Sequence, residues 1–271
     1  TNVLNYLINY IIIEKKIIIK LLIPKKSLGQ NFLIDKNIAK KIAHLCNKPK
    51  EKTIIEVGPG KGALTDQIID LKPKKIVLIE KDKNLYNHLL NKYQKLKFIK
   101  IYNHDAIDFN YDQFAKPKTI ISNLPYNISI KLIFNWFKKI DNYEEIIVMI
   151  QKEVAKKMEF KNIAKKNRLN FMTEIFSNFK IEFNVSKNVF YPKPKINSSV
   201  IKIIPKKNVK YDFMALENFS RKIFHNKRKK ISDVINIEKT KNIKKLTNSK
   251  IFEKRAEDLN LEELLTIFNE Y

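Results

Sequence analysis

The chain has 271 residues, of which 54 are lysine or arginine and 28 are aspartate or glutamate, giving a formal net charge of +26. This excess favours a polyanionic partner, a nucleic acid rather than an anionic membrane surface, although lysine-rich codon usage accounts for part of it. Cys46 is the only cysteine, which excludes an internal disulfide and a cysteine-rich zinc site and fits a reducing compartment. The four histidines are scattered without metal-ligand spacing, so we expect no bound metal.

Residues 1–24 form an apolar stretch that polar side chains interrupt, among them Asn5, Asn9, Glu14 and Lys20. A membrane-spanning helix needs about 18 or more uninterrupted apolar residues, which this stretch lacks. A signal peptide would carry its charges first and end in small residues, which is not the pattern here. We therefore expect no membrane anchor, and we treat residues 1–24 as an N-terminal extension whose structure the sequence leaves open.

Alternating helix and strand signals follow from residue 35 onward, where Asp35 is the expected N-cap of the first helix. Five apolar runs predict strands, and all but the third lead directly into a predicted helix. The strands are expected within residues 53–57, 75–82, 96–103, 118–123 and 144–151, and the helices within 35–46, 63–71, 83–93, 131–139 and 152–158. This alternation predicts a mostly parallel sheet with helices on both faces, a Rossmann-like α/β fold.

The pattern changes after residue 204. Residues 205–208 read Pro-Lys-Lys-Asn, a linker composition, and the remainder carries helical periodicity with few strand signals. We therefore predict an α/β domain over residues 25–205 and a small all-helical domain over residues 206–271.

The ends of the first three strands carry residues that suit a nucleoside. Gly58 and Gly60 follow the first strand, where glycine lets the backbone turn tightly and approach a ligand, but neither a P-loop nor a G-x-G-x-x-G pattern is present. Glu80 closes the second strand, where a carboxylate can hold both ribose hydroxyls. Asp105 follows the third, where it can accept from an adenine amino group. A ligand with ribose and adenine but no phosphate contacts fits best, and S-adenosylmethionine is such a ligand.

The fourth strand ends in a stiff corner, Asn123-Leu124-Pro125-Tyr126. Proline holds the preceding residue extended, so the Asn123 side-chain oxygen and the Leu124 carbonyl can both face a ligand at the strand ends. Two such acceptors can draw the hydrogens of an exocyclic base amine and aim its lone pair at a methyl donor. Tyr126 would stack on the base, which must be swung out of any helix. The alternative is a proline-stabilised turn with a packed tyrosine.

Eight segments, in this order, give the chain its resemblance to the KsgA/Dim-type ribosomal RNA adenine dimethyltransferases. The resemblance runs from about residue 25 to the C-terminus, and it implies a class I methyltransferase domain. The segments are "KKSLGQNFL" (25–33), "EVGPGKGALT" (56–65), "IEKD" (79–82), "HDAIDF" (104–109), "NLPYNIS" (123–129), "MIQKEVAKKM" (149–158), "VFYPKPKINSSV" (189–200) and "FHNKRKKI" (224–231).

The resemblance also implies roles for individual residues. Phe190 would form the second face of a base-stacking sandwich with Tyr126, although a core phenylalanine is an equal alternative. Asn167 stands where the family usually has glycine, which alters a loop without touching the chemistry. The donor site would include Gln30, Asn31, Leu33, Gly58, Gly60, Glu80, Asp105 and Asn123, and RNA phosphates would meet Lys227, Arg228, Lys229 and Lys230.

Three functions remain open from the sequence. The resemblance implies S-adenosylmethionine-dependent N6,N6-dimethylation of two adjacent adenosines in a hairpin loop near the 3′ end of small-subunit ribosomal RNA, during ribosome assembly. An Erm-type enzyme would share the donor site and corner but modify large-subunit RNA. A binding or assembly factor would keep the fold without the activity. We expect a monomer in a bacterial cytoplasm, with an organelle matrix as the alternative.

Overall fold

The computed structural model describes residues 24–25, 28–161, 165–226, 228–235 and 250–270. The expected extension therefore lies outside the described residues, except for Pro24. Across the described ranges, no helix has the length and apolar character needed to cross a bilayer. The strands are β1 (Phe32–Leu33), β2 (Thr53–Val57), β3 (Lys75–Glu80), β4 (Ile99–Asn103), β5 (Lys118–Asn123), β6 (Glu145–Gln151), β7 (Ser177–Val185), β8 (Phe190–Tyr191) and β9 (Ser198–Pro205).

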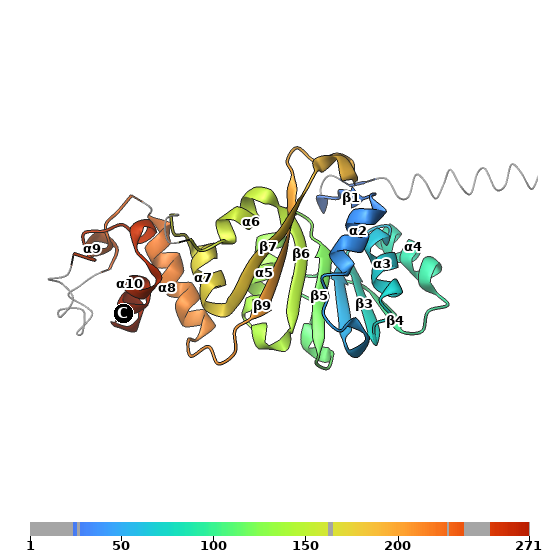
Figure 1. The fold of residues 1–271 in the computed structure, drawn as a ribbon, viewed down its shortest axis with the longest axis horizontal. Helices are drawn as coiled ribbons and strands as arrows, with labels where there is room; N and C mark the ends of the chain where they lie inside the picture. The colour runs from blue at the N-terminus through green and yellow to red at the C-terminus, as the bar shows by residue number, and fades with distance from the viewer. Residues whose placement is uncertain (1–23, 26–27, 162–164, 227, 236–249, 271) are drawn as a thin grey trace, which may run out of the picture.

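Seven of these strands form one twisted sheet in the order β4-β3-β2-β5-β6-β9-β7 (Figure 1). The first five positions are parallel, and β9 pairs antiparallel with both β6 and β7. The predicted Rossmann-like, mostly parallel sheet is confirmed. The strand order reverses between β2 and β5, and ligands in open α/β sheets bind at such a reversal.

Helices cover both faces of the sheet, so the parallel strands β2, β3, β5 and β6 are buried on both sides, whereas the edge strand β4 is partly exposed. Alternate residues of one strand point to opposite faces, so Ile54 of β2 belongs to one hydrophobic cluster and Ile55 to the other. The cluster of Ile54 includes α2, α3 and α4, and that of Ile55 includes α5, α6 and α7. The helices are α2 (Lys36–Ala43), α3 (Ala63–Asp70), α4 (Lys83–Tyr93), α5 (Ser129–Phe137), α6 (Lys152–Met158), α7 (Arg168–Phe176), α8 (Phe213–His225), α9 (Ile231–Val234) and α10 (Leu261–Glu270).

Side-chain caps fix where several helices begin. The predicted cap Asp35 accepts hydrogen bonds from the backbone N–H groups of Asn37 and Ile38. Asn167 forms a capping box with Asn170 at the start of α7. Its φ of −151° is ordinary extended backbone, which explains why asparagine can stand where the family usually has glycine.

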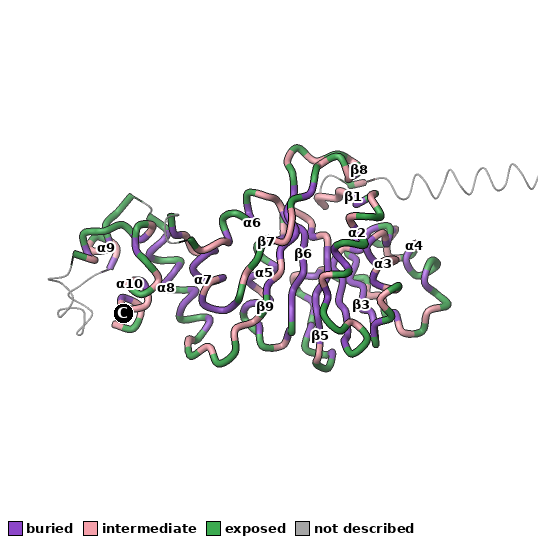
Figure 2. Tube along the Cα trace, viewed as in Figure 1, coloured by how far each residue is buried: buried purple, intermediate pink, exposed green. Residues whose placement is uncertain are grey.

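In the described residues after β9 the long elements are helices, as predicted, and they are joined by turns and an isolated bridge between Lys230 and Arg255. The buried apolar residues described in this region belong to the hydrophobic cluster that also covers the sheet. Figure 2 shows buried positions along both α7 and α8. The Phe171 ring of α7 lies 6.3 Å from that of Phe219 and 6.1 Å from that of Phe224, both on α8. The domain boundary at residue 205 therefore remains a prediction, and side-chain packing is continuous across it.

Candidate active site

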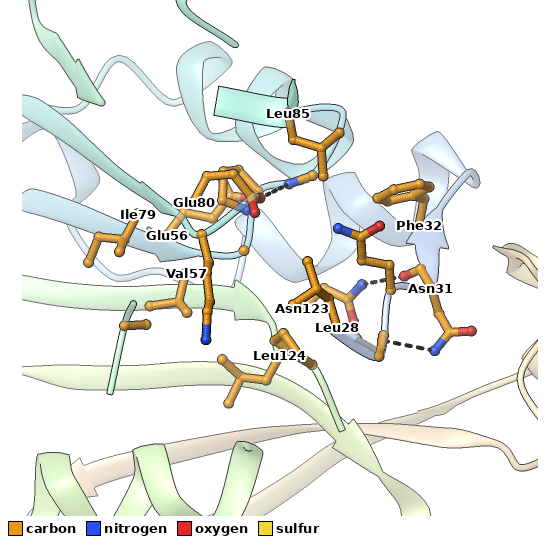
Figure 3. Close-up of a pocket in the computed structure, with 18 of the residues that line it drawn as sticks. Leu28, Asn31, Phe32, Glu56, Val57, Ile79, Glu80, Leu85, Asn123 and Leu124 are labelled. Carbon is orange, nitrogen blue, oxygen red and sulfur yellow. Dashed lines mark hydrogen bonds between the residues drawn. The ribbon is translucent and has the colours of Figure 1, made fainter. Parts of the chain in front are cut away.

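A cavity of about 250 Å³ opens at the carboxyl ends of the parallel strands, where the strand order reverses (Figure 3). The hydroxyl of Ser122, one residue before the end of β5, donates to the Val57 carbonyl and ties β5 to β2 at this point. The lining includes every residue expected in the donor site and the corner, namely Gln30, Asn31, Leu33, Gly58, Gly60, Glu80, Asp105, Asn123, Leu124, Pro125 and Tyr126.

The glycine turn after β2 forms the floor of the cavity. Gly58 and Gly60 have φ values of +63° and +59°, a left-handed conformation that side chains other than glycine rarely adopt. A Cβ on Gly60 would also lie 2.9 Å from the Phe32 ring. The turn can therefore bring bare backbone close to a ligand only with glycine at these positions.

Glu80 presents a buried carboxylate to the cavity and is 5% exposed. One of its oxygens accepts from the Gly60 N–H at 3.2 Å, and the other from the Asp82 N–H at 2.9 Å. Burial raises the pKa of this carboxyl above its usual range, although the backbone hydrogen bonds oppose the shift. Each oxygen keeps lone pairs that can accept from a diol.

Asp105 lies at the cavity edge after β4 and is more exposed than Glu80. Its Oδ1 accepts from the Ile107 N–H at 2.9 Å, and its Oδ2 is 2.7 Å from Lys81 Nζ. Partial burial acts to raise the pKa of Asp105, but the hydrogen bonds from Lys81 and Ile107 outweigh it and hold the pKa below the usual range. The group is therefore an ionised acceptor, with lone pairs left for an adenine amine.

At the corner, two acceptor oxygens are unused. Asn123 Nδ2 donates to the Asn31 carbonyl at 3.2 Å, and the Leu124 N–H donates to the Met149 carbonyl at 3.1 Å. Neither Asn123 Oδ1 nor the Leu124 carbonyl accepts a hydrogen bond from any residue in the described ranges. Figure 3 shows the Asn31–Asn123 contact at the cavity. A segment far away in the sequence thus orients the asparagine amide.

Tyr126 lines the cavity, but Phe190, the expected second stacking residue, does not. The Phe190 side chain is 4% exposed and packs into the hydrophobic cluster with Leu33 and Val185. Its neighbour Tyr191 is 60% exposed and lines the cavity. The structure does not bring Phe190 to the cavity. Adjacent residues of a strand point to opposite sides, and the pairing of β8 with β1 turns Tyr191 toward the cavity and Phe190 toward the hydrophobic cluster.

Several lining residues were missed by sequence reasoning. Phe32 and Tyr191 are paired residues of β1 and β8, which the sequence did not predict as strands. Glu56 also lines the cavity, is 1% exposed, and accepts from the Thr65 hydroxyl at 2.6 Å. An acid inside an otherwise apolar strand was the signal that would have found it.

Glu56→Gln is expected to remove a pH dependence of stability. Burial raises the pKa of Glu56 to about 8 from its ordinary 4.5. At about 1.4 kcal/mol per pKa unit, this shift changes the free energy of unfolding by up to about 5 kcal/mol between low and high pH. A raised folded pKa stabilises the fold below the unfolded pKa, and the contribution is lost as pH rises through 8. The melting temperature of the variant should therefore exceed that of the original protein by several degrees at pH 9. At pH 5 the two melting temperatures should be similar. Glu51→Gln, at an exposed site, is the control, and parallel curves for all three proteins would contradict the assignment.

The basic stretch at 225–230 is only partly described. Arg228 and Lys229 are exposed, as a phosphate contact requires. Lys230 Nζ is already paired with Glu253 at 2.5 Å, and Lys227 lies outside the described residues.

Comparisons with known proteins show the family of the chain. The sequence model of the family described as "Ribosomal RNA adenine dimethylase" matches residues 23–271. The chain is 39% identical over 197 residues to "Ribosomal RNA small subunit methyltransferase A" of Wolbachia sp. subsp. Drosophila simulans (strain wRi), covering 70% of each protein.

Solved structures extend the similarity to the fold. The dimethyladenosine transferase from Plasmodium falciparum is 25% identical, with a TM-score of 0.75 over 88% of this chain and 98% of that one. The 23S rRNA methyltransferase ErmE, 21% identical, shares the fold with a TM-score of 0.69 over 89% of this chain and 99% of that one. The match from residue 23 to the end of the chain carries the conclusion: the chain belongs to the ribosomal RNA adenine dimethylase family.

Proposed function

We propose that this chain transfers methyl groups from S-adenosylmethionine to the N6 atoms of two adjacent adenosines in a loop of small-subunit ribosomal RNA. The observation that carries the proposal is the single cavity that joins Glu80 and Asp105 to the corner at Asn123. Relatives named for the small subunit support this target over large-subunit RNA. A ribosomal substrate requires a compartment shared with assembling ribosomes, and we propose the bacterial cytoplasm.

The residues present suit the donor. Glu80 would accept the two ribose hydroxyls, Asp105 the adenine amine, and the turn at Gly58 would leave room for the methionine part. The left-handed glycines and the buried, backbone-held carboxylate support this fit. When bound, S-adenosylmethionine supplies an electrophilic methyl group on sulfur.

The corner would act on the adenine amine. An exocyclic amine is a poor nucleophile because its lone pair is delocalised into the ring. Asn123 Oδ1 and the Leu124 carbonyl, both unused by described residues, would accept its two hydrogens and favour a pyramidal nitrogen. Catalysis would then rest on positioning and electrostatics rather than on a general base.

The proposal is tested by incubating the purified chain with labelled S-adenosylmethionine and separated, unmethylated small and large subunits. The RNA is digested to nucleosides and analysed by mass spectrometry. N6,N6-dimethyladenosine from the small subunit alone is the expected result. The same product from large-subunit RNA alone would identify an Erm-type target. Donor binding without transfer to either subunit or to an assembly intermediate would favour a binding factor.

Tyr191→Ala is expected to raise the KM for RNA about tenfold with donor affinity unchanged, because stacking of a base on an aromatic side chain contributes about 1–3 kcal/mol. Tyr191 is an exposed aromatic residue that lines the same cavity as Tyr126. Phe190→Ala is the matched comparison, and it should instead lower the free energy of unfolding by about 3–5 kcal/mol because the ring is buried. Steady-state kinetics and chemical denaturation separate the two effects. A KM change confined to the Phe190 variant would restore Phe190 as the stacking residue.

A further inference from the structure

A second hollow of about 340 Å³ lies beside the corner, and four lysines line it. We call it the lysine groove. It is formed by the first turns of α6 and by the segments that flank β8. Its lining residues are Lys152, Glu153, Lys156, Lys187, Lys195, Ile196 and Asn197.

The four lysines of the groove are not neutralised. Many lysines of this chain form ion pairs, as Lys92 does with Asp66 and Lys206 with Glu174. Within the described ranges, no carboxylate lies within 4.0 Å of the ammonium group of any groove lysine. Glu153 is the only acidic residue of the lining. Four unpaired cations in one concave surface repel one another, so the groove favours an anionic occupant.

Hydrogen bonds connect the groove to the corner through two consecutive residues. The Asn197 carbonyl accepts from the Lys152 N–H at 3.0 Å, and its Oδ1 accepts from the Lys187 N–H at 3.0 Å. The next residue, Ser198, shares a hydrogen bond of 2.5 Å with the Tyr126 hydroxyl. Consecutive Cα atoms are about 3.8 Å apart, so the groove residue Asn197 directly adjoins the residue that contacts the Tyr126 hydroxyl.

The sheet leads to the same arrangement. β5 ends in Asn123 and its parallel neighbour β6 ends at Gln151, just before Lys152 and α6. Neighbouring strands lie about 4.8 Å apart. The start of α6 therefore lies beside the end of β5, within reach of the nucleotides that flank a base held at Asn123.

We propose that the lysine groove binds the phosphates of the RNA segment next to the target adenosine, and so sets which nucleotide reaches the corner. This inference rests on the proposed function for the identity of the target. The binding step it describes can still be measured without methyl transfer.

The opposite end of the sheet supplies a matched control. A hollow of the same volume, about 340 Å³, is lined by Lys74, Lys75, Lys97 and Lys116 at the amino ends of β2 and β3, far from the corner. Lys74 and Lys97 are exposed, as are Lys156 and Lys195 of the groove. Removing two positive charges at either end changes the net charge equally, but only one pair lies on the proposed RNA path.

The experiment compares Lys156→Gln/Lys195→Gln with Lys74→Gln/Lys97→Gln in the full chain. The probe is a fluorescein-labelled RNA hairpin whose loop contains two adjacent adenosines, and anisotropy is measured from 50 to 300 mM salt. The groove variant should bind about tenfold more weakly, with a salt slope reduced by about 1.4, since each single-strand phosphate contact contributes about 0.7. The control should retain its affinity within about twofold. At saturating RNA, kcat should be unchanged and only KM should rise.

The outcomes separate the two proposals. Equal losses of RNA affinity in both variants would mean that net charge alone drives binding, and this would contradict the proposal that the groove binds RNA. Unchanged RNA binding with lost binding to small subunits would assign the groove to a ribosomal protein and likewise overturn it. If the original chain binds the hairpin through the groove but methylates no ribosomal RNA, the proposed function is wrong, while the inference that the groove binds RNA is retained.

Discussion

Asn123→Ala is expected to lower kcat for methyl transfer by at least about 100-fold, because removing one preorganised polar group at a reacting centre has an effect of that order. The side chain contributes one of the two corner oxygens that accept no hydrogen bond from a described residue. Donor and RNA affinities should fall by about tenfold at most, since Asn123 is one of eight donor-site residues and a single neutral hydrogen bond contributes about 0.5–1.5 kcal/mol. Single-turnover methylation, with separate binding measurements for each ligand, checks this.

Two further variants serve as controls for the Asn123→Ala result. Asn178→Ala, at an exposed position on β7, should leave transfer unchanged and controls for the loss of an asparagine side chain. Asn123→Asp keeps an acceptor oxygen but cannot donate to the Asn31 carbonyl, so it should also lose activity if the orientation of the oxygen matters. An Asn123→Ala variant that transfers methyl groups within threefold of the original chain would contradict the catalytic assignment.

The parallel half of the sheet could be predicted because its local and overall signals agree. Each strand is a short, mainly apolar run. Four of the five, β2 to β5, lead into a glycine turn, an acid or the proline corner, so the site residues fall at the carboxyl ends of these four strands. Gly58, Gly60, Glu80, Asp105 and Asn123 line one cavity as a result. Gln30, Asn31 and Leu33 line the same cavity, but their place there was expected only from the family resemblance.

Other features could not be predicted because long-range pairing creates them. β7 has mostly partly exposed or exposed residues, and its pairing with β9 contains a register irregularity, so it lacks the apolar run of a central strand. Tyr191 lines the cavity where Phe190 was expected, and this depends on the two-stranded pairing of β1 with β8. The lysine groove joins residues more than thirty positions apart in the sequence, and no local pattern indicates it.

Glu80→Ala is expected to weaken donor binding by about 100-fold or more, because a hydrogen bond to a charged group contributes about 1.5–3 kcal/mol and a ribose offers two hydroxyls. Glu80→Gln should also weaken it. Each carboxylate oxygen already accepts a backbone N–H, one from Gly60 and one from Asp82, so an amide nitrogen would face a donor at one of them. Titration calorimetry with S-adenosylhomocysteine measures both losses. Asp70→Asn, at an exposed carboxylate ending α3, is the control.

The pH dependence of donor affinity distinguishes a direct contact from a merely structural role. Hydroxyl donors favour the ionised carboxylate, and burial raises the pKa of Glu80 above its usual value of 4.5. Affinity in the original chain should therefore be full above that raised pKa and fall as pH decreases through it. Asp105 does not produce the same transition, since its pKa is held below 3.8. The fall in affinity should be absent from Glu80→Gln, while circular dichroism shows both proteins folded throughout. If the variant keeps the same pH profile, Glu80 does not hold the ribose, and its carboxylate serves only to fix the backbone of the glycine turn.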